Sequence, residues 1–258
     1  MHYYMKTFVK SLLYLIITGA ITSHELGFRE GVPESEKTAT ENSKFGAPEV
    51  RLLSIRECGT GKIFICFRAL RDNLQDHDYE VRLASVRGLG ILGLDEAIDP
   101  LNKRLDTEKD ARMRSTIIWS LGMIGDTASA ATVEPHVGDP EEVIRKEAAV
   151  SLGKIGSKSS LVSLQKQLEA EKIDKVKVEI LKSLLILQPQ NAEYIADMIS
   201  MLKNEEAWVR YYTANAIVDL KLKSAYRPLQ RALLLESDPI VRSALHKAYL
   251  TTIYEYDR

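Results

Sequence analysis

EVIRKEAAVSLGKIG, residues 142–156, is the stretch that decides the fold, because the rest of the chain repeats it. The pattern is an aliphatic residue before an arginine, a small residue six positions later, then leucine and Gly-x-x-Gly. Complete or degraded copies recur around seven basic anchor residues, spaced by 31 to 33 positions: Arg51, Arg82, Arg114, Arg145, Lys177, Arg210 and Arg242. A fixed period of this length over about 200 residues is typical of a solenoid of stacked repeats.

Each repeat is predicted to form two helices, a helix A that carries the anchor and a helix B that follows it. In helix A, Ile144, Ala148 and Leu152 recur at helical spacing. Gly-x-x-Gly then ends the helix, because glycine adopts the left-handed cap conformation without a Cβ penalty. Helix B continues with apolar residues such as Leu164 and Leu168. One such hairpin cannot bury its apolar stripe alone, so neighbours must stack. The expected fold is all-α, a right-handed α-α superhelix of about six hairpins plus a C-terminal half repeat.

A column of small residues lies six positions after the anchors in helix A. Its members are Gly88, Ser120, Ser151, Ser183, Ala216 and Ala248. A larger side chain would overpack such a position if a neighbouring helix approached it closely. The column therefore predicts a close helix–helix contact in every repeat.

The arginine anchors form a second column, made of Arg82, Arg114, Arg145, Arg210 and Arg242. An arginine one turn into a helix can fork onto a carboxylate or a carbonyl of the adjacent repeat. Because the column belongs to the repeat itself, we interpret it as a structural ladder between repeats. The alternative is a stripe of cations that binds anions.

The pattern D-x-x-V-R-x-x-A-x-x-x-L-G-x-x-G followed by a short second helix resembles the HEAT-like repeats of the phycobilisome-lyase type. The resemblance covers roughly residues 46–258 and is clearest in the repeats anchored at Arg82, Arg114 and Arg145. It implies an α-α superhelix that chiefly binds other proteins. Some members of the family handle bilin chromophores, and some relatives are dimetal hydroxylases or nucleic-acid glycosylases.

The N-terminal region differs from the repeats. Residues 1–23 combine Lys6 and Lys10 with a short apolar run and small residues, which is typical of a secretory signal peptide. The alternative is an uncleaved membrane anchor over residues 5–23. We expect residues 24–46 to be a flexible linker, because they are polar and rich in Gly, Pro, Ser and Thr. Residues 47–258 are then the repeat domain of a periplasmic or secreted protein.

The two cysteines, Cys58 and Cys66, flank the turn of the first repeat at positions that face the interior of the hairpin. In an exported protein they could form a disulfide that stabilises this terminal repeat. Two buried free cysteines are the alternative reading.

Several kinds of chemistry have no motif in this chain. None of the histidines pairs with another His or a Cys at metal-ligand spacing, so we expect no metal site. There is no nucleophile motif and no phosphate-binding loop after a strand, so we expect no catalytic residue and no cofactor. The net charge of −1 argues against nucleic acid as a partner.

The function that remains is a non-enzymatic scaffold that binds a protein or peptide. We expect its site on the concave face, formed by the B helices of the C-terminal half, at Tyr194, Met198, Arg227 and Arg231. Trp119 stands in a mostly polar column and is either a further anchor for the partner or packed under a neighbour. A chromophore-lyase-like or isomerase role, suggested by the resemblance alone, is the alternative, as is a constitutive part of an envelope complex.

Overall fold

The computed structural model describes residues 34–45, 47–61 and 64–256, and the predicted signal peptide lies outside them. Within these ranges every regular element is helical, with 14 α-helices and short 3-10 helices between them. The predicted all-α solenoid of six hairpins and a final half repeat is confirmed. No helix in the described ranges has the length and apolar character that a bilayer crossing requires.

The chain divides into two compact units, Met1–Pro100 and Leu101–Arg258. In the first unit, α2 is followed by two hairpins, α3 with α4 and α5 with α6, and the boundary between the units falls inside α6. The bounds are α2 Glu34–Phe45, α3 Pro48–Thr60, η1 Phe64–Cys66, α4 Phe67–Asp72, η2 Asn73–Gln75, α5 Tyr79–Leu92, η3 Asp95–Ala97 and α6 Ile98–Thr107.

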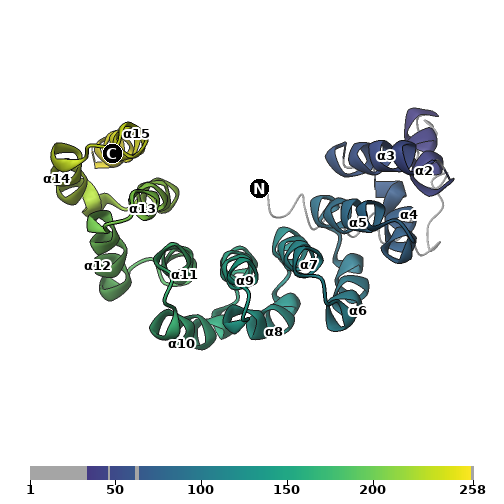
Figure 1. The fold of residues 1–258 in the computed structure, drawn as a ribbon, viewed down its shortest axis with the longest axis horizontal. Coiled ribbons are helices and arrows are strands. Elements are labelled where there is room, and N and C mark those ends of the chain that lie inside the picture. Colours follow the sequence, from purple (N-terminus) through teal and green to yellow (C-terminus); the bar gives the residue numbers. More distant parts are fainter. Residues whose placement is uncertain (1–33, 46, 62–63, 257–258) are drawn as a thin grey trace, which may run out of the picture. The chain divides into compact units, whose positions relative to one another are not determined.

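The second unit contains four complete hairpins and a last single helix. The bounds are α7 Ala111–Ile124, η4 Thr127–Ser129, α8 Ala130–Val133, η5 Glu134–Gly138, α9 Glu142–Ile155, η6 Lys158–Ser160, α10 Leu161–Ala170, α11 Asp174–Leu187, α12 Ala192–Ser200, η7 Met201–Lys203, α13 Ala207–Leu220, η8 Lys223–Ala225, α14 Tyr226–Leu235 and α15 Pro239–Tyr256. Its A helices α7, α9, α11, α13 and α15 pack side by side in one row, and α8, α10, α12 and α14 form a second row (Figure 1).

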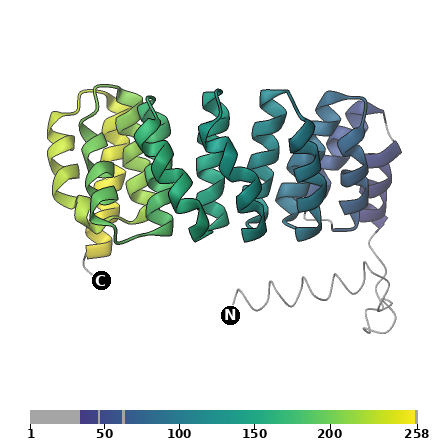
Figure 2. The same cartoon turned by 90° about the horizontal axis from the view of Figure 1, so that it is seen from below.

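The two rows of the second unit are not equivalent. Figure 1 shows this unit bending, with the A helices as the inner row and the B helices as the outer row. Seen from below, the helices of the unit stand roughly parallel to one another (Figure 2). The concave face of this unit is therefore formed by A helices, and the prediction that B helices form it is wrong.

The two glycines of each Gly-x-x-Gly motif have different roles. The second glycine is the cap: Gly125 and Gly156 end α7 and α9 in the left-handed conformation, with φ of 72° and 74°. The first glycine is a packing residue, since a Cβ built on Gly153 would lie 2.6 Å from the Ser183 hydroxyl oxygen. The motif is lost after α13 and after α11: Lys221 takes the left-handed conformation with φ of 52°, whereas Gln188 ends α11 with φ of −136°.

The small-residue column brings neighbouring A helices together. The Ser151 hydroxyl donates to the carbonyl oxygen of Ile118 at 3.0 Å, and the Ser183 hydroxyl donates to that of Ala149 at 2.7 Å. Both serines are buried. Both serines thus lie against the backbone of the preceding A helix, at the close contact that the column predicts.

Residues 34–45 form the helix α2, so the prediction of a flexible linker over 24–46 is wrong in this part. The helix packs on α3 and α4 through the buried residues Ala39 and Ser43. Asn73, itself buried, donates from its side-chain amide to the Ser43 carbonyl oxygen at 2.7 Å. Ala39 and Ser43 are small residues at helical spacing, so the sequence of α2 lacks the apolar stripe that predicts a packed helix. Residues 24–33 lie outside the described ranges.

Candidate functional site

The arginine ladder is made of forked ion pairs between neighbouring repeats. Arg145 donates from Nε and Nη2 to the two carboxylate oxygens of Glu171, at 2.7 Å and 3.1 Å. Its Nη1 donates to the carbonyl oxygens of Asp139 and Pro140. Arg210 repeats this arrangement with Glu236, at 2.7 Å and 2.9 Å. Every nitrogen of these two guanidinium groups is therefore engaged within the fold.

The other anchors follow the same plan with variations. Arg114 pairs with the carboxylate of Asp139 in the next repeat, as Arg51 pairs with Asp76. The remaining two arginines donate to carbonyl oxygens in the turn that precedes their own helix, Arg82 to Asp76 and His77, and Arg242 to Glu236. These contacts connect repeats and turns, as a structural ladder requires, and they leave little free charge for the alternative, an anion-binding stripe.

The acceptors of the ladder form a column that the sequence analysis missed. The column lies six positions before the anchors and comprises Asp76, Glu108, Asp139, Glu171, Asn204 and Glu236. Glu108 is an exception within it, because its carboxylate pairs with Arg104 instead of an anchor arginine. Each member of the column accepts a hydrogen bond from backbone N–H groups just ahead of the next helix A. The acidic residues four positions before the anchors have a different role, since Asp78 and Asp110 cap helices. The shared period of the two columns was the signal that could have identified this one.

The ladder carboxylates are held ionised. Burial by itself would raise the pKa of Glu171, but hydrogen bonds from Arg145, from two backbone N–H groups and from Gln167 outweigh it. The pKa of Glu171 is lowered to about 2. The Arg210 hydrogen bonds lower the pKa of Glu236 in the same way, against the opposing effect of burial. Each pair is therefore a neutral, saturated unit at physiological pH.

Two residues of the predicted binding face are core residues. Tyr194 is 4% exposed and Met198 is fully buried, so the prediction that they contact a partner is wrong. The Tyr194 hydroxyl accepts a hydrogen bond from the Gln165 side-chain amide. In α12 the buried stripe lies 17 and 21 positions after the anchor, whereas in α10 it lies 15 and 19 after, at Ser160 and Leu164. Helix A ends at the same distance from the anchor in both repeats, at Ile155 and Leu187. The stripe of α12 is displaced because the turn after Leu187 lacks the glycine cap and is two residues longer, so that the B segment is capped at Asn191, whereas the earlier one is capped at Ser157.

The other predicted partner contacts are distributed over both rows. Arg227 and Arg231 are exposed on α14, in the outer row. Trp119 is half-buried on α7, with the Lys154 ammonium of the next A helix 6.0 Å from the centroid of its ring. The five predicted residues therefore do not form one surface.

Exposed apolar side chains of the second unit concentrate on its inner row. Seven large ones lie on A helices: Met123, Val143, Ile186, Trp208, Tyr212, Ile240 and Leu250. On the outer row the corresponding residues are Val162 on α10 and the adjacent pair Leu234 and Leu235 on α14. The inner row is therefore the more apolar of the two surfaces.

An aromatic cluster lies on α13 of this row, formed by Trp208, Tyr211 and Tyr212. The ring centroids lie 5.6, 6.5 and 5.7 Å apart, and two of the three contacts are edge-on. Trp208 is 57% exposed, and together with Ile240 of α15 it lines a small hollow. On the other side, Tyr212 borders the exposed ion pair of Lys175 and Glu142, 2.8 Å apart. The aromatic cluster thus exposes apolar surface to solvent, and the ion pair of Lys175 and Glu142 beside it carries no net charge.

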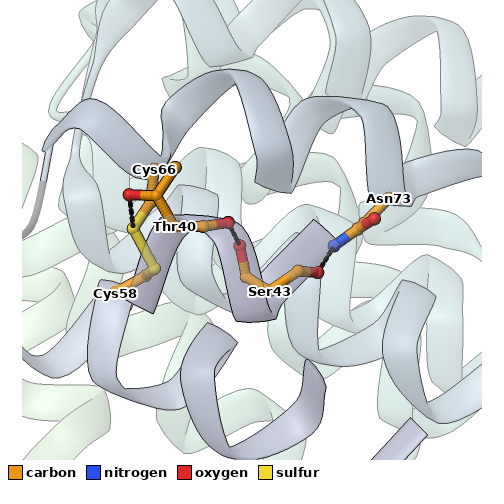
Figure 3. Close-up of a disulfide and its surroundings, with 5 residues drawn as sticks. All are labelled: Thr40, Ser43, Cys58, Cys66 and Asn73. Atoms are coloured by element: carbon orange, nitrogen blue, oxygen red, sulfur yellow. Dashed lines mark hydrogen bonds between the residues drawn. A yellow bond between two sulfur atoms is a disulfide. The ribbon is translucent and has the colours of Figure 1, made fainter. Parts of the chain in front are cut away.

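A disulfide joins Cys58 of α3 to Cys66 of η1, with a Cα–Cα distance of 5.9 Å (Figure 3). Both residues are fully buried, and the Thr40 hydroxyl of α2 lies 3.4 Å from the Cys66 sulfur. The bond and α2 together cover one end of the first unit. In the ranges that the structure describes, His, Cys, Asp and Glu form no group of three or more able to hold a metal ion.

The sequence profile of the HEAT repeats matches residues 46–122 and 107–185, which together span more than half of the chain. No curated protein matches the chain. In fold, the chain is similar to the complex of CpcE and CpcF of phycocyanin lyase from Nostoc sp. PCC7120, with a TM-score of 0.63 and 16% identity over 87% of this chain and 97% of that chain. It is also similar to the Escherichia coli protein YibA, with a TM-score of 0.51 and 14% identity over 86% of this chain and 98% of that one. At these identities the likeness shows the fold alone.

Proposed function

Because this chain belongs to the HEAT-repeat family, we propose that it is a non-enzymatic scaffold that binds a protein partner on the inner row of its second unit. The observation that carries the proposal is the aromatic cluster. A tryptophan that is 57% exposed beside two tyrosines and an exposed isoleucine has no structural role that requires this exposure. Tryptophan and tyrosine are enriched among the residues that dominate interface energies.

The surroundings of the cluster indicate the chemistry of the partner. Of the charged groups that line the hollow beside Tyr212, Glu142 and Lys175 form an ion pair, and Lys146 and Glu179 add one charge of each sign. A further ion pair, Lys182 with Asp219, joins α11 and α13. A partner that presents apolar or aromatic side chains can cover this surface without leaving a charge unpaired, and the packed A helices lose little freedom when it binds.

The proposal is tested by removing the apolar area and comparing the captured proteins. Tagged wild-type protein and the Trp208→Ala, Ile240→Ser double variant are used as bait, with Val162→Ser as the matched control. Val162 is 74% exposed but lies on α10 in the outer row. We expect a protein captured by wild type and by the control to be lost with the double variant, since interface tryptophans contribute about 2 kcal/mol or more. Equal capture by all three baits refutes this location.

We also propose that the scaffold is exported, on the composition of residues 1–23, which lie outside the described ranges. The test is cell fractionation with N-terminal sequencing of the mature chain. A mature N-terminus after Ala20 or Ser23 in the periplasm or medium supports cleavage. Full-length protein in the membrane fraction identifies residues 5–23 as an anchor, and full-length protein in the cytosol refutes export.

A further inference from the structure

A second candidate site lies on the outer row, between α12 with its extension η7 and the next B helix, α14. The cavity there measures about 510 Å³, which is within the usual range for small-molecule sites. Its apolar wall comes from both sides, with Ile199 and Leu202 on one and Pro228, Ala232 and Leu235 on the other. The site belongs to a different face from the aromatic cluster.

The polar floor of this cavity is already saturated. Arg210 and Glu236 form the forked pair of the ladder, and the third nitrogen of Arg210 donates to the carbonyl oxygens of Asn204 and Glu205. The Asn204 side chain donates to the Asp174 carboxylate and accepts from the backbone of Glu206. The floor therefore offers a ligand little further hydrogen bonding.

Two cations at the cavity remain available. Lys203 and Arg231 both line it, are exposed, and take part in none of the ion pairs that the structure shows among its described residues. The Glu236 carboxylate is engaged by Arg210, so the local charge of the cavity is positive. An anionic group is the complement of these cations, and a guanidinium matches a carboxylate in geometry and charge.

The mouth of the cavity is apolar. Leu235, which lines it, is 85% exposed, and the neighbouring Leu234 is 80% exposed. Leucines this exposed, next to a partly apolar cavity, provide apolar area that an aliphatic chain can remove from water.

We propose that this cavity binds an aliphatic monocarboxylate of small-molecule size. The carboxylate lies between Lys203 and Arg231, and the hydrocarbon chain lies along Ile199, Ala232 and Leu235. The inference is independent of the proposed protein-binding function, because it concerns the other row of helices. Such a ligand would pair with both cations, Lys203 and Arg231, and would cover the exposed side chain of Leu235.

The test is calorimetric titration of the full chain with decanoate, kept below its micelle-forming concentration, and with decanol as the neutral analogue. We expect saturable binding of one decanoate per chain and at least tenfold weaker binding of decanol. The Lys203→Gln, Arg231→Gln double variant is expected to bind decanoate about tenfold more weakly. The matched control is Arg227→Gln, which removes an exposed arginine one turn away on α14 that does not line the cavity.

A second variant tests the volume of the cavity. Ala232→Phe places a ring in the cavity while both cations remain, and it is expected to reduce decanoate binding with an unchanged circular dichroism spectrum. Equal affinity for decanol and decanoate overturns the proposal, as does equal weakening by Arg227→Gln, or binding of a leucine-terminated peptide without binding of decanoate.

Discussion

The close contact between α9 and α11 yields a prediction in which two effects oppose each other. Replacing Gly153 by alanine in the last turn of α9 should stabilise the protein by up to about 1 kcal/mol on helix propensity alone. The structure predicts the opposite. The new Cβ would lie 2.6 Å from the Ser183 hydroxyl oxygen, 3.0 Å from its Cβ and 3.2 Å from its Cα. The last of these contacts involves backbone, so a change of rotamer cannot relieve it.

The magnitude follows from three contributions. Overpacking in a buried contact costs about 2 kcal/mol. Displacing the Ser183 hydroxyl from the Ala149 carbonyl oxygen costs about 1 kcal/mol more. After the gain of about 1 kcal/mol in helix propensity, Gly153→Ala is expected to lower the free energy of unfolding by about 2 kcal/mol.

The assay is urea denaturation followed by circular dichroism, arranged as a double-mutant cycle. Ser183→Gly removes the hydroxyl and the Cβ, so the alanine methyl group can occupy the vacated space. We expect the double variant to lose about 1–2 kcal/mol less than the sum of the two single variants. The matched control is Gly138→Ala, whose Cβ would meet only the Gln167 side-chain oxygen, at an ordinary 3.6 Å. A Gly153→Ala variant more stable than wild type, or an additive cycle, would falsify the close contact.

Three further predictions concern the ladder, the caps and the disulfide. The pKa of Glu171 is about 2 in the folded protein, below its ordinary value of 4.5. The stabilisation that the ionised carboxylate gives to the folded state is therefore fully present above pH 4.5 and is lost as the pH falls towards 2. Glu171→Gln should therefore lower the free energy of unfolding at pH 7 by up to about 3 kcal/mol. It should also make this free energy depend less on pH between 4.5 and 2 than it does in the wild type, and an unchanged dependence would contradict the ionised pair with Arg145. Lys221→Gly should raise the free energy of unfolding by about 1 kcal/mol, because lysine is strained at φ of 52°, and a thermal melt with a lower midpoint would argue against that strain. Replacing Cys58 and Cys66 by serine should cost about 2.5 kcal/mol for a loop this short, and non-reducing peptide mass spectrometry that finds both thiols free would show that no bond forms.

The arrangement within a repeat could be predicted from the sequence because it depends only on nearest neighbours. The period, the helix A stops at glycines such as Gly125 and Gly156, and the small column at Ser151 and Ser183 all describe contacts between adjacent helices. These contacts recur identically, so several copies of one pattern report the same geometry. The arginine column was recognised for the same reason.

Features that break the repeat could not be predicted. The helix α2 packs through Ala39 and Ser43, and small residues carry no periodic hydrophobic signal. The buried position of Tyr194 depends on the rotation of α12, which a turn without a glycine cap displaces relative to the other B helices. A pattern averaged over the other repeats placed this residue on the wrong side of its helix.

The period of the sequence determined that this protein is a stack of helical hairpins joined by an arginine ladder, since every copy must satisfy the same local packing. Only the tertiary structure decided which row of helices lies inside the bend of the second unit. That choice follows from small rotations between successive hairpins, which add up along the stack. Each rotation is too small to produce a recognisable pattern in the sequence of one repeat. Because Tyr194 and Met198 are buried and the A helices form the inner row, the candidate surface is the one that contains Trp208 and Ile240.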